Sequence, residues 1–301
     1  MRLPKITEVT LRPVMSSAFH TVHMLDAISR KSERLSLTKL DSVEFAYLRE
    51  GLDQYYASLE LVRSFSRILS VERISDDLIG SQADEIQLTP APLPCHSNLN
   101  GLTFLNSSID PISISEFLFA TQSLEQLSYR PDLRSPGLRD FDAFWIRTAL
   151  MSNARSILKS LSILAHNHAR DYMGSVEDFL CWEFLKTDLR LLIGAPAESY
   201  HDPISVLPAS IIEVKLHVDH SLDASRYKAI MLSTKNGLKY CPHLSDFTVV
   251  GIPHGALSAP SSNVLITEFW NTALTFSYHR ESWRRQSQTP KGPWETINLG
   301  R

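Results

Sequence analysis

Histidine and cysteine side chains form short groups whose residue types could bind a metal ion. His166 and His168 are alternate residues after a predicted strand, and alternate strand residues can ligate one ion. A transition-metal site needs three or four ligands, and the sequence supplies no clear partner pair. Cys241-Pro-His243 lacks the paired spacing of a zinc site, so we expect Cys241 to pack, buried, before a strand. No metal and no cofactor is expected.

Acid–base chemistry is suggested by His217-x-x-His220 together with Asp219, next to Ser221. These residues are neighbours in sequence, whereas a catalytic triad is assembled in space. The sequence also lacks the glycine-rich phosphate loops G-x-G-x-x-G and G-x-x-x-x-G-K-[ST] and the nucleophile elbow G-x-S-x-G. We therefore predict a protein that is not an enzyme. The alternative is an α/β hydrolase or transferase with its site at strand C-terminal ends, using residues such as His166, His217 or Asp219.

Asp188 belongs to the run Thr187-Asp188-Leu189-Arg190, which places a charged pair in an apolar stretch. It could anchor a partner. We favour a structural role, in which its carboxylate caps amides of a neighbouring strand or loop, because buried backbone N–H groups require acceptors.

Composition limits the function further. The chain has 301 residues, 43% of them hydrophobic, which is sufficient for a large packed core. Its 30 basic and 33 acidic residues give a net charge of −3, so we expect no nucleic acid partner. Three widely spaced cysteines fit a reducing compartment without disulfides. No signal peptide or membrane span is evident, and we expect a soluble intracellular protein, cytoplasmic or nuclear, with no membrane contact.

A repeated pattern, apolar-x-x-apolar-x-apolar, predicts short strands along the chain. Its middle apolar residues are Val9, Val43, Leu102, Leu127, Leu161, Val214 and Phe247. Two gaps are of double length and hold degenerate copies, which are Ile68-x-x-Val71-x-x-Ile74 and Trp182-x-x-Leu185 running into Leu189. A last strand is predicted at Leu274-x-Phe276. About ten repeats of roughly 30 residues are close to the period of leucine-rich repeats.

Helices are predicted between the strands. Candidate segments are Gly51–Leu69, a helix after the capping box Ser113-x-x-Glu116, a helix capped by Asp140 or Asp142, Leu222–Tyr240 and Asn263–Thr272. The Pro-rich segments Thr89–Pro94 and Arg130–Gly137 are predicted loops. This alternation predicts an α/β leucine-rich-repeat-like solenoid, a horseshoe with a curved parallel sheet and outer helices, over residues 1–278, with a polar, basic tail at 279–301. The alternative is a doubly wound sheet or a (β/α) barrel.

Five segments carry a resemblance to the leucine-rich-repeat region of fungal F-box/leucine-rich-repeat proteins. They are Ser156–Leu164, Glu177–Gly194, Leu207–Val218, Asp223–Tyr227 and Cys241–Gly251. The resemblance implies repeats that recruit a substrate for a cullin-type ubiquitin ligase, with an N-terminal F-box on a Skp-type adaptor. Here a repeat already begins at Leu3. We therefore expect no F-box, and the resemblance does not extend to Skp binding.

Residues between the core positions of each strand should point to the concave face, because side chains alternate along a strand. We predict that this face binds a protein partner. The predicted partner-binding residues are Arg12, Glu44, Thr103, Ser128, Arg130, Ser162, Lys215, His217 and Thr248, and Leu105, Leu164 and Val250 share their positions. Trp145, Trp182 and Trp270 are predicted core residues, and Trp283 and Trp294 could form a docking motif in the tail.

Overall fold

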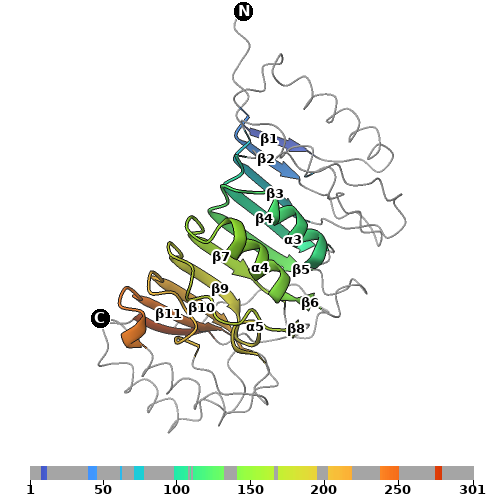
Figure 1. Ribbon diagram of the computed structural model, residues 1–301. Coiled ribbons are helices and arrows are strands. Elements are labelled where there is room, and N and C mark those ends of the chain that lie inside the picture. The colour runs from blue at the N-terminus through green and yellow to red at the C-terminus, as the bar shows by residue number, and fades with distance from the viewer. Residues whose placement is uncertain are drawn as a thin grey trace, which may run out of the picture. The chain divides into compact units, whose positions relative to one another are not determined.

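The structure is a computed structural model (Figure 1). The chain divides into two compact units, Met1–Ser162 and Ile163–Arg301. The described residues are 8–11, 40–45, 62, 71–77, 98–107, 109, 111–131, 141–165, 169–194, 203–218, 238–250 and 275–279. We refer to the two as unit 1 and unit 2 and describe each by itself.

The described part of unit 1 consists of parallel strands with helices on one side. In chain order its elements are β1 (Glu8–Leu11), β2 (Ser42–Phe45), β3 (Arg73–Asp77), β4 (Gly101–Ser107), α3 (Pro111–Phe119), β5 (Gln126–Pro131), β6 (Phe141–Asp142), α4 (Ala143–Asn153) and β7 (Ser160–Ile163), which ends one residue beyond the unit. The strand order is β1-β2-β3-β4-β5-β7, and the pairs from β1 to β5 are parallel.

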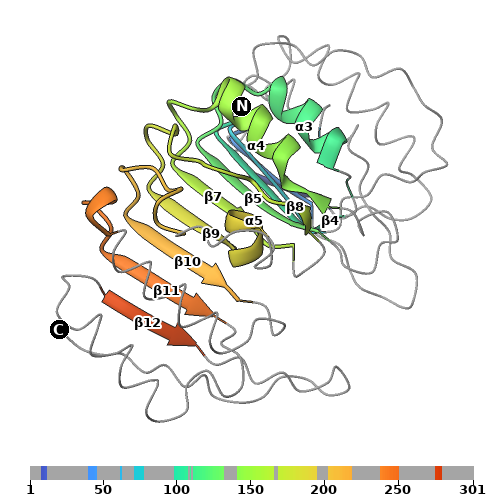
Figure 2. The ribbon, with the colours of Figure 1, turned by 60° about the horizontal axis from the view of Figure 1, so that its bottom comes forward.

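Unit 2 has the same parallel arrangement. Its elements are β8 (Ala169–Asp171), β9 (Phe184–Asp188), α5 (Leu189–Ile193), β10 (Glu213–His217), the 3-10 turn η2 (Leu238–Tyr240), β11 (Asp246–Val250) and β12 (Thr275–His279). Strands β9, β10, β11 and β12 pair in that order and all run in one direction (Figure 2). Strand β12 includes His279, the first residue of the segment predicted as the tail.

The register of these strands follows the sequence pattern, and the predicted strands are confirmed. The middle apolar residues pair in line as Val9, Val43, Ile74, Leu102 and Leu127 in unit 1, and as Leu185, Val214, Phe247 and Phe276 in unit 2. The fold is therefore α/β with parallel strands. A doubly wound sheet reverses its order at one point, whereas within each unit the order follows the chain.

The two degenerate repeats have a different alignment from the predicted one. In the first, Ile74 holds the middle position, so the repeat reads Val71-x-x-Ile74-x-Asp76. In the second, Thr187 holds the third core position and Leu189 instead begins α5. Both copies carry a polar residue where the pattern has an apolar one, which is why they are hard to align from the sequence.

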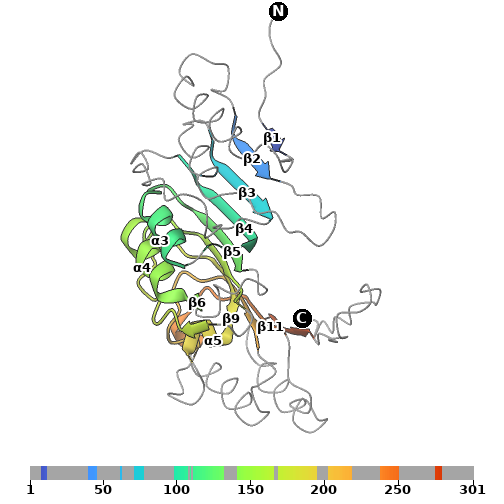
Figure 3. The same cartoon turned by 90° about the vertical axis from the view of Figure 1, so that its right-hand side faces the viewer.

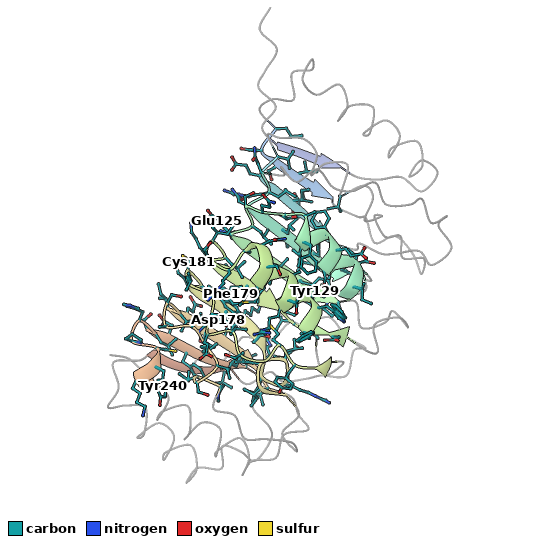
Figure 4. All side chains as sticks on the ribbon, viewed as in Figure 1. Glu125, Tyr129, Asp178, Phe179, Cys181 and Tyr240 are labelled. Atoms are coloured by element: carbon teal, nitrogen blue, oxygen red, sulfur yellow. The ribbon has the colours of Figure 1, made fainter. Side chains whose placement is uncertain are left out.

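The core of unit 1 lies between the sheet and its helices, which cover one face of the strands (Figure 3). Phe104 of β4 meets Phe117 of α3 edge to face, with ring centroids 6.4 Å apart, and both side chains are fully buried. Tyr129 of β5 is also buried, and its hydroxyl donates to the Ile109 carbonyl oxygen at 2.8 Å (Figure 4). Each buried aromatic side chain stabilises the core by about 1.5–3 kcal/mol relative to exposure.

The first residues of α4 agree with the predicted helix cap, whereas those of α3 do not. Asp142 is the N-cap of α4, and its carboxylate accepts from the Phe144 amide at 2.8 Å, as predicted. Helix α3 instead begins at Pro111, a residue that suits the first helical position because it lacks an N–H. Ser113 and Glu116 therefore lie inside α3, and the predicted capping box there is wrong.

Neighbouring repeats are joined by one recurring backbone junction. The carbonyl oxygen two residues before the middle apolar position accepts two successive amides of the next repeat, at 2.8–3.2 Å. The acceptors are Asp41, Glu72, Asn100 and Glu125 in unit 1, and Glu183 and Ile212 in unit 2. Ser123 and Ser210 strengthen the same junction, because their hydroxyls donate to the carbonyls of Leu99 and Trp182 in the preceding repeats.

Several predictions fall outside the described residues. These are the loop Thr89–Pro94, the residues beyond His279, the tryptophans Trp270, Trp283 and Trp294, and the helices Gly51–Leu69, Leu222–Tyr240 and Asn263–Thr272. Two parts of these helices are described. Val62 is helical and buried, and Leu238–Tyr240 form η2. Arg130 and Pro131, the first two residues of the predicted loop Arg130–Gly137, belong to β5, and the rest of that predicted loop lies outside the described residues. No helix in the described part of the chain is long and apolar enough to cross a membrane.

The tryptophan predictions have mixed outcomes. Trp182 is fully buried, as predicted, and it lies just before β9. It packs on Phe179, which Figure 4 labels, and ring centroids of the two side chains are 4.9 Å apart. Trp145 is 44% exposed on α4, so the prediction that it belongs to the core is wrong. Its neighbour Ile146 is buried instead, because adjacent helical residues point in different directions.

Candidate functional site

Each unit has a strand face that points away from its core, and we call it the open face. In β4, Leu102 and Phe104 are buried on the side of α3, so Thr103 and Leu105 point the opposite way. The same alternation appears in β10, where Val214 and Leu216 are fully buried while Lys215 and His217 are partly exposed. Because the strands are in register, equivalent residues form rows that cross the sheet.

A row of small hydroxyl side chains crosses the open face of unit 1. Ser75, Thr103 and Ser128 are direct register partners on β3, β4 and β5, and all three are partly exposed. Glu44 of β2 precedes them in the row and is exposed. Ser162 occupies the equivalent position of β7 and is partly exposed. The row offers hydroxyl donors and acceptors on successive strands, about 4.8 Å apart.

Two exposed arginines flank this hydroxyl row. Arg73 precedes Ser75 by two residues on β3, and Arg130 follows Ser128 by two residues on β5. Gly101 is the register partner of Arg73, and a Cβ at Gly101 would lie 3.3 Å from Arg73 Cγ. The glycine therefore leaves space for the arginine side chain above β4. In the described part of the chain, neither arginine has an ion pair or hydrogen bond from its side chain.

The open face of unit 2 carries charges of both signs. Lys186 and Lys215 are register partners, with Thr248 next in the row, and all three are partly exposed. The row before them holds Glu213 and Asp246. The Ser245 hydroxyl donates to Asp246 Oδ2 at 2.7 Å. This face has no excess of one charge among its described residues.

Most residues predicted for the binding face are at least partly exposed. Glu44 and Arg130 are exposed, and Thr103, Ser128, Ser162, Lys215, His217 and Thr248 are partly exposed. Arg12 lies outside the described residues. Leu105 is 36% exposed, whereas Leu164 and Val250, which share its position, are buried and do not belong to an accessible surface. The position nearest the strand end thus belongs to the open face only in some repeats.

Sequence reasoning missed several open-face residues. Ser75 and Lys186 were missed because they belong to the two degenerate repeats, which lack the apolar residue that marks the third core position. Arg73, Gln126 and Glu213 were missed for another reason. They directly precede the middle apolar residue, and strand alternation alone would have placed this third row on the same face.

Asp188 has the structural role that the sequence favoured. Its side chain is 6% exposed, and its Oδ2 accepts from the Ala165 amide at 2.6 Å, in a loop 23 residues earlier. Although Asp188 is also the N-cap residue of α5, its side chain makes no hydrogen bond to that helix. The carboxylate therefore ties the loop after β7 to the end of β9.

The structure describes only some of the metal and catalytic candidates. Cys241 is buried, and its thiol lies 3.8 Å from the Ile204 carbonyl oxygen and 3.7 Å from that of Pro208, which confirms the predicted packing role. His166, His168, Asp219 and His220 lie outside the described part of the chain. Within that part, no group of three His, Cys, Asp or Glu side chains could hold a metal ion.

These features define an α/β protein with parallel strands and a polar, partly exposed strand face in each unit. Comparison of the sequence with protein-family models finds no matching family, and comparison with curated proteins finds no match.

Proposed function

We propose that the chain is a leucine-rich-repeat-like solenoid that binds a protein partner on its open face and is not an enzyme. The observation that carries this proposal is the in-register row of small polar side chains, Ser75, Thr103 and Ser128, on adjacent parallel strands. Such rows repeat the same chemistry at about 4.8 Å intervals over several strands. An extended surface of this kind suits a protein segment better than a small molecule, which binds in a concave pocket.

The repeat junctions support the solenoid part of the proposal. In a solenoid each repeat contacts its neighbours through the same interactions. The paired amide bonds to the carbonyls of Asp41, Glu72, Asn100 and Glu125 are such an interaction, repeated with the same geometry in unit 1. The carbonyls of Glu183 and Ile212 repeat it in unit 2.

By its resemblance to F-box/leucine-rich-repeat proteins, we propose that the bound partner is a substrate of a cullin-type ubiquitin ligase. Four of the five segments that carry this resemblance contain described strands or their flanking turns, namely Ser156–Leu164, Glu177–Gly194, Leu207–Val218 and Cys241–Gly251. In that family the repeats recruit the substrate, and we propose that the open face does so here.

A matched pair of variants tests the binding face. Ser128→Trp puts a bulky side chain into the hydroxyl row, whereas Ser152→Trp makes the same change on the exposed side of α4. The tagged wild-type chain and both variants are used for affinity purification from native extract, with mass spectrometry as the readout. We expect specific proteins that bind the wild type and Ser152→Trp but are lost with Ser128→Trp, at unchanged circular dichroism.

Each outcome has a definite meaning. Equal recovery by all three chains would contradict binding at the open face, and so would the absence of any specific protein with the wild type. Recovery of cullin or Skp subunits with the wild-type chain, whether or not Ser128→Trp removes them, supports the ligase role. Specific partners without any ubiquitin-ligase subunit or ubiquitinated protein contradict that role and leave a recognition module.

A further inference from the structure

We propose that the open face of unit 1 binds an extended, carboxylate-rich segment of a partner protein. In this arrangement Arg73 and Arg130 pair with acidic side chains, and the hydroxyl row between them bonds the backbone of the segment. The inference rests on the proposed function, since it names the chemistry of the partner that the open face would hold.

The hydroxyl row has unused hydrogen-bonding capacity. Ser75, Thr103 and Ser128 are partly exposed, and none of the three hydroxyls has a hydrogen bond to another group in the described part of the chain. A hydroxyl both donates and accepts, so the row can serve the alternating N–H and C=O groups of an extended backbone. The side chains of the row are also short, so a backbone can approach the sheet closely between the longer flanking residues.

The charge of the ligand follows from the two arginines. Both are exposed, and neither has an ion pair in the described part of the chain. A guanidinium binds a carboxylate with two parallel N–H···O bonds, which are stronger than bonds between neutral groups. Glu44, next to Ser75 in the row, is exposed and negative, so it repels a carboxylate from the β2 side of the row.

The spacing of the arginines sets the spacing of the acidic residues. Arg73 lies in line with Gln126 of β5 through Gly101, and Arg130 lies four residues further along β5. Two strands across and four residues along correspond to a Cα separation of about 16 Å. Residues i and i+4 of an extended segment lie on one side of it, with Cα atoms about 13 Å apart. The arginine and carboxylate side chains are long enough to make up the difference from about 16 Å. The preferred segment therefore carries two acidic residues four positions apart.

The equivalent surface of unit 2 does not share this preference. There the lysines Lys186 and Lys215 lie beside a row with Glu213 and Asp246, so attraction and repulsion of a carboxylate compete. The preference for an acidic segment is thus assigned to unit 1.

Selection from random peptides on the intact chain tests the inference directly, because a random library does not require the partner to be identified. The probe is a phage-displayed library of random peptides of about 16 residues, long enough to cross the sheet when extended. We expect selected peptides that are enriched in Asp and Glu, with pairs at i and i+4. Arg73→Gln and Arg130→Gln should each weaken the selected peptide about tenfold. Lys159→Gln is the matched control, because it also removes one positive charge from unit 1 but outside the open face, from an exposed ion pair with Glu125. It should change the affinity for the peptide less than twofold.

The outcomes separate this inference from the proposed function. Peptides that lack acidic enrichment but lose binding with Ser128→Trp would overturn the acidic partner while keeping the binding face. If Lys159→Gln weakens the binding of acidic peptides as much as the two arginine variants do, the binding reflects net charge alone, which would also overturn the acidic partner. If no peptide is selected, or if the selected peptides ignore both Ser128→Trp and the arginine variants, both the inference and the proposed function fail.

Discussion

The bond from Asp188 to the Ala165 amide gives the sharpest prediction for stability. Ala165 is fully buried and Asp188 nearly so, and the bond is 2.6 Å long. Asp188→Ala removes a charged acceptor and leaves a buried N–H without this partner. The loss of a hydrogen bond to a charged group, with a buried donor left behind, costs about 2–3 kcal/mol. Asp188→Asn keeps an oxygen acceptor but loses the charge, and should cost about 1 kcal/mol.

Urea denaturation of the intact chain measures this order. For an unfolding slope of about 2–3 kcal/mol per molar urea, Asp188→Ala should lower the midpoint by about 1 M, and Asp188→Asn by less than half of that. Hydrogen exchange of the Ala165 amide should accelerate in the same order, because the lost bond protects that group. If Asp188→Ala unfolds at the wild-type midpoint, or if Asn is no better than Ala, the carboxylate is not the structural cap described here.

Three further changes have defined expectations for the free energy of unfolding, each measured by urea titration. Thr187→Val should raise the free energy of unfolding by about 1 kcal/mol, because the Thr187 hydroxyl is buried without a hydrogen-bond partner in the described part of the chain. A decrease would show that the hydroxyl is bonded. Gly194→Ala should lower the free energy of unfolding by about 1–3 kcal/mol, since Gly194 has φ +84° and ψ −174° and a Cβ there would lie 3.1 Å from the Tyr172 ring. Tyr172→Ala in the same chain should recover only the part of this loss that comes from the clash with the ring, and full recovery would contradict backbone strain. Tyr129→Phe should lower it by about 1–2 kcal/mol through loss of the buried bond to Ile109, and an unchanged value would count against that bond.

The strands could be predicted from the sequence because their signal is periodic and local. Each repeat places three apolar residues at fixed spacing, and the register of the sheet follows those residues. The two degenerate repeats show the limit of this signal. Asp76 and Thr187 stand at the third core position, so the pattern could be found there but not aligned. A polar residue at a core position is tolerated when the rest of the repeat supplies enough burial, as fully buried Trp182 and Leu185 do beside Thr187.

The candidate site was predicted only in part. Alternation gives the face of a residue, which is why Thr103, Ser128 and Lys215 were assigned correctly to a partly exposed surface. It does not give the neighbours that cover a strand end. Val250 follows the same alternation as His217, yet it is buried, and its carbonyl accepts from the Val218 amide at 2.8 Å. Exposure at strand ends depends on tertiary packing, which the pattern of a single repeat does not encode.

The repeat junction has a consequence for how such a chain can change. One carbonyl accepts both amides of the next repeat, so these two hydrogen bonds use only backbone atoms. The residues that supply the carbonyl have side chains as different as those of Asp41, Asn100 and Ile212. Substitution at these positions therefore leaves the joint intact, and deletion or duplication of a whole repeat recreates the same joint with new neighbours. The surface chemistry and the number of repeats can vary independently of the mechanism that holds successive repeats together.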